Sequence, residues 1–269
     1  MFTAGSWLLY RYVYIPVIDD HDPEEDETGE VYCLSVMISG VGEMSPVLRR
    51  VLASAARLQS VVPDAVLVGG SAAALHAGHR DSLDHDHVLA DLVDRYEAVL
   101  EAVESTEGWA TSVRASKPPF TIMGSLDGIE AGLRQMRRIR PLETVEVVVG
   151  PGAVVVAPTE AEALRVKAFL VVQRNVVRDF LDVVALVDHI GEDAADGVLS
   201  GIDGYYVDRS GDPASVLTSL VVALAEPSPR DTDVIDELPR YKGLDPRWHC
   251  WSDVVDACQA LALRLGGAA

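Results

Sequence analysis

One segment constrains the fold of this chain more than any other: residues 66–89, VLVGGSAAALHAGHRDSLDHDHVL. A short apolar run predicts a buried strand that ends at Gly69 and Gly70, where two glycines allow a tight turn. The small apolar residues that follow predict a short helix, and a second strand is expected from Leu83 to Leu89. This order of strand, glycine turn, helix and strand predicts an α/β region built around these residues.

Polar groups lie at the start of the expected helix and on the strand that follows it. Ser71 lies at the helix N-terminus, where a hydroxyl and backbone N–H groups can hold a phosphate. Residues two apart on a strand point to the same face, so Asp84 and Asp86 present two carboxylates side by side, while His85 and His87 point the other way. Two hard oxygen ligands beside a phosphate cradle suit Mg²⁺. The segment therefore predicts a site where Mg²⁺ bridges the protein and a nucleotide.

The rest of the chain divides by its pattern into mixed and helical parts. We expect an α+β fold with three parts: a β-hairpin-like extension over 1–43, a mixed sheet with flanking helices over 44–157, and a mainly α-helical domain over 158–269. In the extension, aromatic and β-branched residues predict strands over 8–17 and 31–39, joined by an acidic loop.

Further elements follow from apolar spacing and from end signals. Ser45 is expected to cap a helix that has Pro46 at its first position. In the mixed part we expect helices over 45–60, 92–104 and 129–139, and strands over 110–114, 120–123, 144–149 and 153–156. In the helical part we expect helices over 159–172, 176–190, 213–225 and 252–265.

Composition excludes several classes of protein. The formal net charge of −20 argues against broad nonspecific binding to DNA or to anionic lipid. The sequence has no stretch of about 18 uncharged apolar residues, so no membrane span is expected. The first residues lack the basic region of a signal peptide. The three cysteines, Cys33, Cys250 and Cys258, are too few and too widely spaced for a disulfide framework, so we expect a cytoplasmic protein.

Two segments carry a resemblance to a known family. Residues 66–89 resemble the signature of the DNA polymerase beta nucleotidyltransferase superfamily, which has Gly-Gly/Ser, a short helix and then Asp-x-Asp. Residues 158–186, PTEAEALRVKAFLVVQRNVVRDFLDVVAL, are similar to the lysine-containing helix and Arg-Asp-x-x-Asp of the AbiEii/AbiGii-type nucleotidyltransferase toxins. With residues 119–143, the likeness covers roughly residues 60–190. It implies a nucleotidyltransferase-like sheet followed by the helical half.

The resemblance also implies roles for particular residues. The nucleotide would be held by Gly69, Gly70, Ser71, Lys167 and Arg178, with Lys167 on the triphosphate. Asp84 and Asp86 would hold Mg²⁺, and Asp179 or Asp182 would complete the polar set from the helical half. A third carboxylate is expected on a neighbouring strand, with Glu146 as first and Glu143 as second choice. Either Glu146 or Asp182 would accept the proton of the acceptor hydroxyl.

The implied reaction is the transfer of a nucleoside monophosphate from an NTP to RNA, for instance to a tRNA 3′ end, with release of pyrophosphate. The result would be growth arrest, and a cognate antitoxin protein would be the partner. No membrane or DNA-specific binding is expected. Three alternatives stay open: transfer to a small molecule, transfer to a protein hydroxyl, and a non-catalytic nucleotide-binding module. A histidine–aspartate phosphohydrolase site is less consistent with Asp84-His85-Asp86-His87, because that chemistry places its ligands on helices.

Helical geometry gives separate support to the second motif. At 100° per residue, one face would carry Lys167, Arg174, Arg178 and Asp182, provided that the helix continues through Asn175. Such a stripe could grip phosphates.

Two other clusters have open readings. The densest basic patch either binds phosphates or pairs with the many acids: Arg134, Arg137, Arg138 and Arg140. The spacing of His76, His79, His85 and His87 fits no zinc motif, so we expect them at helix ends and in strand packing.

Overall fold

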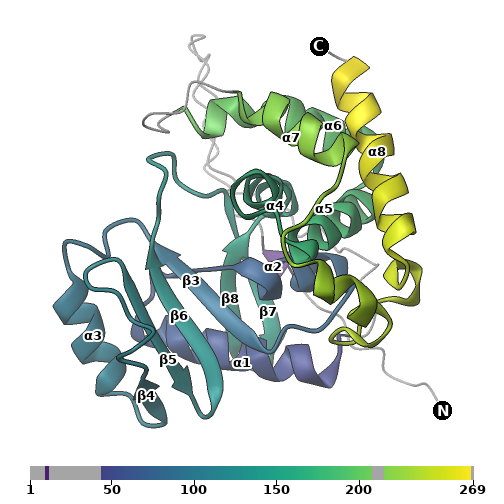
Figure 1. The fold of residues 1–269 in the computed structure, drawn as a ribbon. Coiled ribbons are helices and arrows are strands. Elements are labelled where there is room, and N and C mark those ends of the chain that lie inside the picture. Colours follow the sequence, from purple (N-terminus) through teal and green to yellow (C-terminus); the bar gives the residue numbers. More distant parts are fainter. Residues whose placement is uncertain (1–9, 12–43, 208–214, 268–269) are drawn as a thin grey trace, which may run out of the picture.

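The strands of the chain form two sheets. The computed structural model describes residues 10–11, 44–207 and 215–267 (Figure 1). A five-stranded sheet has the order β2 (Val66–Val68), β3 (Asp84–Leu89), β6 (Ile129–Gln135), β5 (Thr121–Leu126) and β4 (Trp109–Thr111). In it β3 and β6 are parallel and the other neighbours are antiparallel. A three-stranded antiparallel sheet has the order β1 (Tyr10–Arg11), β7 (Thr144–Gly150) and β8 (Ala153–Pro158).

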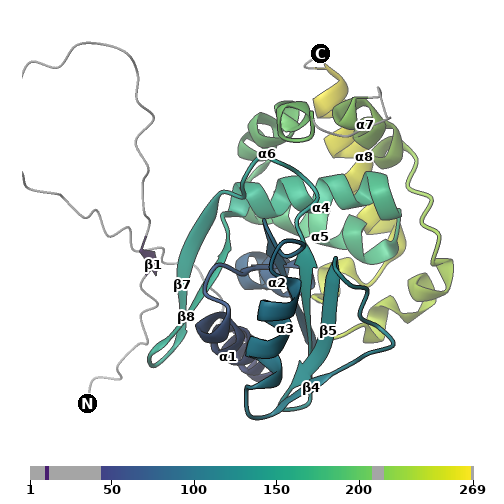
Figure 2. The same ribbon diagram turned by 90° about the vertical axis from the view of Figure 1, so that its left-hand side faces the viewer.

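Helices cover the strands and build the second half of the chain. The mixed part contains α1 (Pro46–Val61), α2 (Gly69–Ala77) and α3 (Tyr96–Glu104). The helical half contains α4 (Glu160–Arg174), α5 (Val177–Ile190), α6 (Glu192–Ser200), α7 (Val216–Ala225) and α8 (Trp251–Gly267), with 3₁₀ turns η1 (Ile202–Tyr205), η2 (Thr232–Arg240) and η3 (Pro246–Trp248). Figures 1 and 2 show the helical half gathered at one end of the strands, and α2 contacts both β3 and α5. The expected α+β class, with a mixed sheet, flanking helices and a helical second half, is confirmed.

The ends of the helices follow the signals in the sequence. The Ser45 side chain accepts a hydrogen bond from the Leu48 N–H (3.0 Å), and Pro46 opens α1 as expected. Thr159 caps α4 in the same way through the Glu162 N–H (3.2 Å). α4 ends at Arg174, and the φ of 51° at the next residue, Asn175, takes the chain out of the helix.

The expected helix over 129–139 is wrong, because these residues form β6. Asp127 and Gly128 have φ of 51° and 80°, and they form a two-residue turn between Leu126 and Ile129. Asp-Gly is a favoured pair for such a hairpin turn, because both residues need positive φ. Along β6, Ile129, Ala131 and Leu133 are buried, while Glu130 and Arg134 are exposed. The segment is therefore the second strand of a hairpin, with one face open.

Other expectations are met in part. The helix expected over 92–104 begins at Tyr96, and α6 was not expected. The predicted strands over 8–17 and 31–39 lie outside the described residues except for Tyr10–Arg11, whose backbone pairs with Glu146 and Val147. In the part of the chain that the structure describes, no helix combines the length and apolar character needed to cross a membrane.

Three groups of buried apolar side chains hold the fold together. The largest lies within the helical half, around Phe180, Leu164 and Leu220. A second joins α1 and α2 to β7 and β8, and a third joins α1 and α3 to β5 and β6. Because α1 contributes to two of them, it fixes the two sheets relative to each other.

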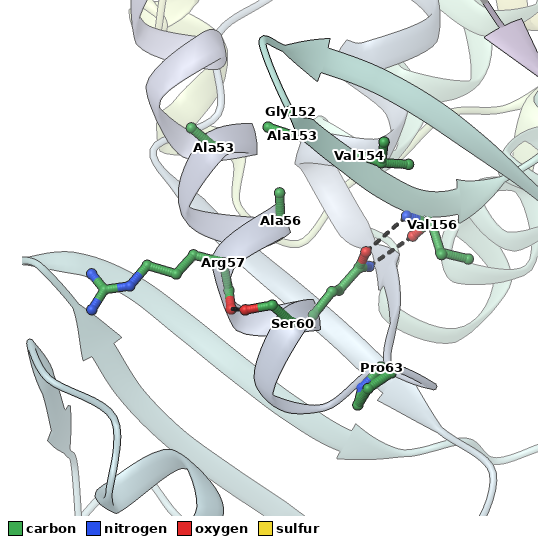
Figure 3. Close-up of a pocket in the computed structure, with 10 residues that line it drawn as sticks. Ala53, Ala56, Arg57, Ser60, Pro63, Gly152, Ala153, Val154 and Val156 are labelled. Carbon is green, nitrogen blue, oxygen red and sulfur yellow. Dashed lines mark hydrogen bonds between the residues drawn. The ribbon is translucent and has the colours of Figure 1, made fainter.

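A side chain from α1 forms hydrogen bonds with the backbone at the outer edge of β8. β8 pairs with β7 on one side, and on the other the buried Gln59 amide bonds to both main-chain groups of Val156: Nε2 donates to the carbonyl (2.8 Å) and Oε1 accepts from the N–H (2.7 Å) (Figure 3). Around this contact lies a pocket of about 510 Å³, lined by α1 residues such as Ala53 and Ala56 and by β8 residues such as Val154. None of the predicted site residues lines it.

Candidate active site

Asp84 and Asp86 lie together on one face of β3, as the alternation predicted. Both are partly exposed, whereas His85 and His87 on the opposite face are buried. Asp84 Oδ1 accepts a hydrogen bond from Ser82 Oγ (3.1 Å). The two carboxylates therefore open toward solvent from a strand whose other face is fixed in the interior.

The turn between β2 and α2 brings the start of a helix to these aspartates. Gly69 has φ of 78°, and a β-carbon on it would lie 3.7 Å from Asp86 Oδ2. A β-carbon on Gly70 would lie 2.6 Å from Arg80 Nη2, so the guanidinium occupies the space that a side chain would need. The first N–H groups of a helix have no partner within it, and they favour anions. The predicted phosphate cradle thus borders the carboxylate pair.

Ser71 lies in the first turn of α2, as expected, but its hydroxyl already has a partner inside the protein. Its hydroxyl is buried and donates to the main-chain carbonyl of Asp84, thirteen residues further on. This bond joins the start of α2 to the start of β3. The hydroxyl is engaged inside the protein, so a phosphate on this turn would meet the backbone N–H groups.

The strand beside β3 carries a carboxylate that sequence reasoning missed. Because β6 runs parallel to β3, Glu130 stands opposite Asp84 and Gly132 opposite Asp86. Paired residues share a face of a sheet, so the exposed Glu130 side chain lies on the open face. A β-carbon on Gly132 would lie 2.4 Å from Asp86 Oδ1, so this carboxylate needs glycine beside it.

The two glutamates chosen from the sequence lie elsewhere. Glu146 is on β7, in the three-stranded sheet, opposite Val156. Glu143 accepts from Arg165 Nη1 (2.9 Å) and from the Tyr205 hydroxyl (2.7 Å), next to the helical half. The expectation that Glu146 stands on a strand beside the aspartates is wrong, because that neighbour is β6.

Lys167, Asp179 and Asp182 meet inside the helical half. α4 and α5 are two helices that pack on each other, so the continuous stripe expected along one helix does not form. Lys167 Nζ nevertheless lies 2.6 Å from Asp182 Oδ2 and 3.7 Å from Asp179 Oδ1. Arg174 binds Asp179 through Nε (2.9 Å) and Nη2 (2.6 Å), and Arg178 is exposed. Lys167, Asp179 and Asp182 are therefore all buried in ion pairs.

Arg80 and His79 complete this buried network. Arg80 grips Asp182 with Nε on Oδ1 (2.8 Å) and Nη2 on Oδ2 (3.0 Å), and His79 Nε2 lies 2.8 Å from the same Oδ1. Burial by itself would raise the pKa of Asp182, but Arg80 and Lys167 hold this pKa well below its usual value. Asp182 is therefore a buried anion that fixes Arg80 against Gly70.

The four arginines expected as one patch have different surroundings: three have separate partners, and Arg137 is exposed. Arg134 Nε lies 3.3 Å from Asp86 Oδ1, at the open face. Arg138 is buried and forms an ion pair with Glu162. Arg140 lies over the Tyr205 ring, 3.7 Å from its centroid. Only Arg134 is placed beside the aspartate pair by a direct contact.

The residues of the open face fit a divalent cation. Two carboxylates on one strand are enough for Mg²⁺ when water and substrate phosphates supply the other ligands. Among the described residues, no group of three or more His, Cys, Asp and Glu side chains is placed to hold a metal.

The histidines lie as expected, at helix ends and in strand packing. His76 and His79, at the end of α2, contact the Pro158 carbonyl (2.8 Å) and Asp182. On β3, His85 Nε2 lies 3.0 Å from Ser54 Oγ of α1, and its ring meets that of His87 edge to face.

No family model matches the chain. The heme uptake protein MmpL11 of Mycobacterium tuberculosis is 28% identical over 275 residues, which cover 98% of this chain. The mycolic acid-containing lipids exporter MmpL11 of Mycolicibacterium smegmatis is 26% identical over 268 residues, again 98% of this chain. The chain spans only 28% and 27% of the length of these two relatives.

Solved structures similar to this chain include nucleotidyltransferase-like proteins. An antigenic nucleotidyltransferase-like protein from Paracoccidioides brasiliensis has a TM-score of 0.41 and 16% identity, covering 65% of this chain and 94% of that one. A structure described as a putative nucleotidyltransferase from H. pylori has a TM-score of 0.42 and 13% identity, covering 85% of this chain and 99% of that one. TM-scores in this range leave the function to be judged from the site itself.

Proposed function

We propose that this chain is a nucleotidyltransferase that moves the nucleoside monophosphate of an NTP to an acceptor hydroxyl. The observation that carries the proposal is the position of Asp84 and Asp86 on one open strand face beside the start of α2, with the β-carbon position of Gly69 3.7 Å from Asp86 Oδ2. Carboxylates next to unpaired backbone N–H groups meet the needs of a cation and a phosphate chain together. Mg²⁺ held by Asp84 and Asp86 would neutralise phosphate charge and favour in-line attack.

The chain's own residues orient the reactants. N–H groups at the start of α2 bind the phosphates, and Arg134 balances charge near Asp86. The acceptor oxygen forms a bond to the α-phosphorus, the bond from that phosphorus to the bridging oxygen breaks, and pyrophosphate leaves with the electron pair. We assign the hydroxyl proton to Glu130, which is exposed on the same face. Asp182 serves as a positioning residue for Arg80, because its side chain is fully buried.

For the acceptor we propose RNA, with a tRNA 3′ end as the reacting group and a cognate antitoxin as partner. The support is the resemblance of residues 158–186 to the AbiEii/AbiGii-type toxins. The proposal places the protein in the cytoplasm, where NTPs and tRNA occur. The net charge of −20 favours instead a small-molecule or protein acceptor, so the acceptor has to be tested directly.

The test is Mg²⁺-dependent release of pyrophosphate from each NTP, with total RNA, with an aminoglycoside, with a protein extract, or with no acceptor. Labelled NTP identifies the product on a gel. We expect label on RNA that is lost in Asp84→Asn and kept in Asp94→Asn, which changes an exposed aspartate outside the site. No pyrophosphate under any condition would contradict the proposal.

The likeness to MmpL11 supports a second candidate, a non-catalytic module that accompanies a transport protein. The alignment covers 98% of this chain but 28% of the M. tuberculosis relative, as expected for one domain of a larger protein. Such a module would bind nucleotide without turnover, or would bind heme. Titration with heme, followed by absorbance, and with NTP, followed by calorimetry, separates these outcomes from catalysis.

A further inference from the structure

The candidate site needs cations that its buried ion pairs do not supply. A nucleoside triphosphate carries several negative charges, and Mg²⁺ on two aspartates neutralises few of them. Lys167 is 3% exposed and held by two aspartates, and Arg80 is equally buried on Asp182. Arg134 already faces Asp86. The charges that meet the end of the phosphate chain have to come from another element.

The loop between η2 and η3 returns to the start of the aspartate strand. The Lys242 carbonyl accepts the N–H of Asp81 (2.7 Å), and the Asp245 N–H donates to the His79 carbonyl (2.8 Å). A β-carbon on Gly243 would lie 2.8 Å from Asp81 Oδ2. The loop is thus bonded to residues that precede Asp84 by only a few positions.

Lys242 has an unusual backbone in this loop. Its φ is 40°, a left-handed value that costs free energy for a residue other than glycine. Its Nζ lies 5.8 Å from the centroid of the Tyr241 ring. Burial raises the pKa of the Tyr241 hydroxyl, Arg80 and Arg178 act to lower it, and Asp182 and Asp84 act to raise it. The Lys242 ammonium therefore lies beside this ring, on the loop that is bonded to the segment before Asp84.

Two cations near this ring have no carboxylate partner among the described residues. The Lys242 side chain contacts the Tyr241 ring and forms no ion pair in the described part of the chain. Arg178 is exposed at the start of α5, and it too forms no ion pair with a described residue. The chain contains only three lysines, Lys117, Lys167 and Lys242, in a sequence where arginine is the usual basic residue. Lys242 is the one of the three that is both partly exposed and bonded to the segment leading into Asp84.

We propose that Lys242, together with Arg178, binds the β- and γ-phosphates of the NTP from the helical half, opposite Asp84 and Asp86. This inference rests on the proposed nucleotidyl transfer. It assigns to Lys242 the selectivity for a triphosphate over a monophosphate. Lys242 contacts groups that leave as pyrophosphate, so it acts on NTP affinity more than on the acceptor.

The experiment compares binding of an NTP and of the matching NMP, by calorimetry with Mg²⁺, in the full chain and three variants. Lys242→Met removes the ammonium, and Lys117→Met is the matched control on an exposed lysine near β5. Lys242→Gly also removes the ammonium but suits the positive φ, so it stays informative if the methionine variant folds poorly. Thermal unfolding of each variant reports on the fold.

We expect both Lys242 variants to raise the NTP dissociation constant about tenfold or more, and to change that of the NMP less than about twofold. Lys117→Met should bind both as wild type does. NTP binding that survives in both Lys242 variants would overturn the inference while leaving nucleotidyl transfer intact, as would an equal loss of NTP and NMP. If wild type itself binds no NTP, the proposed function fails first, and the role of Lys242 fails with it.

Discussion

Lys167 Nζ and Asp182 Oδ2 are 2.6 Å apart, and their side chains are 3% and 0% exposed. The pair joins α4 to α5, and the same carboxylate is held bidentately by Arg80, which follows α2. One buried aspartate thus connects the helical half to the turn at Gly70. The lysine implied as a triphosphate ligand stands inside this connection.

Lys167→Met should lower the free energy of unfolding by about 3 kcal/mol, because it leaves buried carboxylates with fewer cations. Arg80 and Arg174 remain as partners, which keeps the loss at the lower end for a broken buried pair. Urea unfolding measures it, with Lys117→Met as the exposed control. Unchanged stability together with a raised KM for NTP would show instead that Lys167 reaches the triphosphate.

Acid should destabilise the fold through His85. Burial lowers the pKa of His85 to about 4, against 6.5 for a free histidine. The unfolded chain therefore binds the proton first, and the stability contribution is full above pH 6.5 and is lost as the pH falls from there toward 4. From pH 7.5 to pH 5 the loss is about 2 kcal/mol from this group. Urea unfolding at the two pH values should show a smaller difference in His85→Gln; an equal difference would assign the effect to other groups.

Asp84→Asn and Asp86→Asn should each reduce nucleotidyl transfer at least about a hundredfold with the fold intact, because each removes charge at the transition state and no core packing. Initial rates with Mg²⁺ and thermal unfolding check the two parts, beside Asp94→Asn. Near-normal turnover in either site variant would remove these aspartates from the mechanism.

Glu130→Gln and Glu146→Gln form a matched pair. Both glutamates are exposed strand residues, but only Glu130 shares the open face with Asp84. We expect Glu130→Gln to lower kcat about a hundredfold or more and to alter the acid limb of the pH profile, while Glu146→Gln behaves as wild type. The reverse result would restore the assignment made from the sequence.

The segment over 66–89 was predictable because its signals are local. Two glycines end β2, apolar residues form α2, and alternation places Asp84 and Asp86 on one face. Each signal depends on neighbours within a few positions, so no knowledge of the remote chain was needed.

The error at 129–139 has a physical cause. Ile129 and Leu133 are four residues apart, a spacing that suits a helix as well as a strand. The turn at Asp127-Gly128 decides between the two, and only the strand that follows it places Glu130 opposite Asp84. The roles of Arg80 and Lys242 depend on contacts with Asp182 and Asp81, which lie 102 and 161 positions away in the sequence. Local pattern carries no information about such pairs.

The Gln59 amide limits strand pairing at the outer edge of β8. An unpaired strand edge invites another strand, and the consequence is self-association through backbone hydrogen bonds. Gln59 takes both the donor and the acceptor of Val156 in the middle of β8, so an incoming strand finds no continuous ladder there. A side chain from α1 thereby occupies the two backbone hydrogen-bonding groups of Val156 that a neighbouring strand would otherwise use.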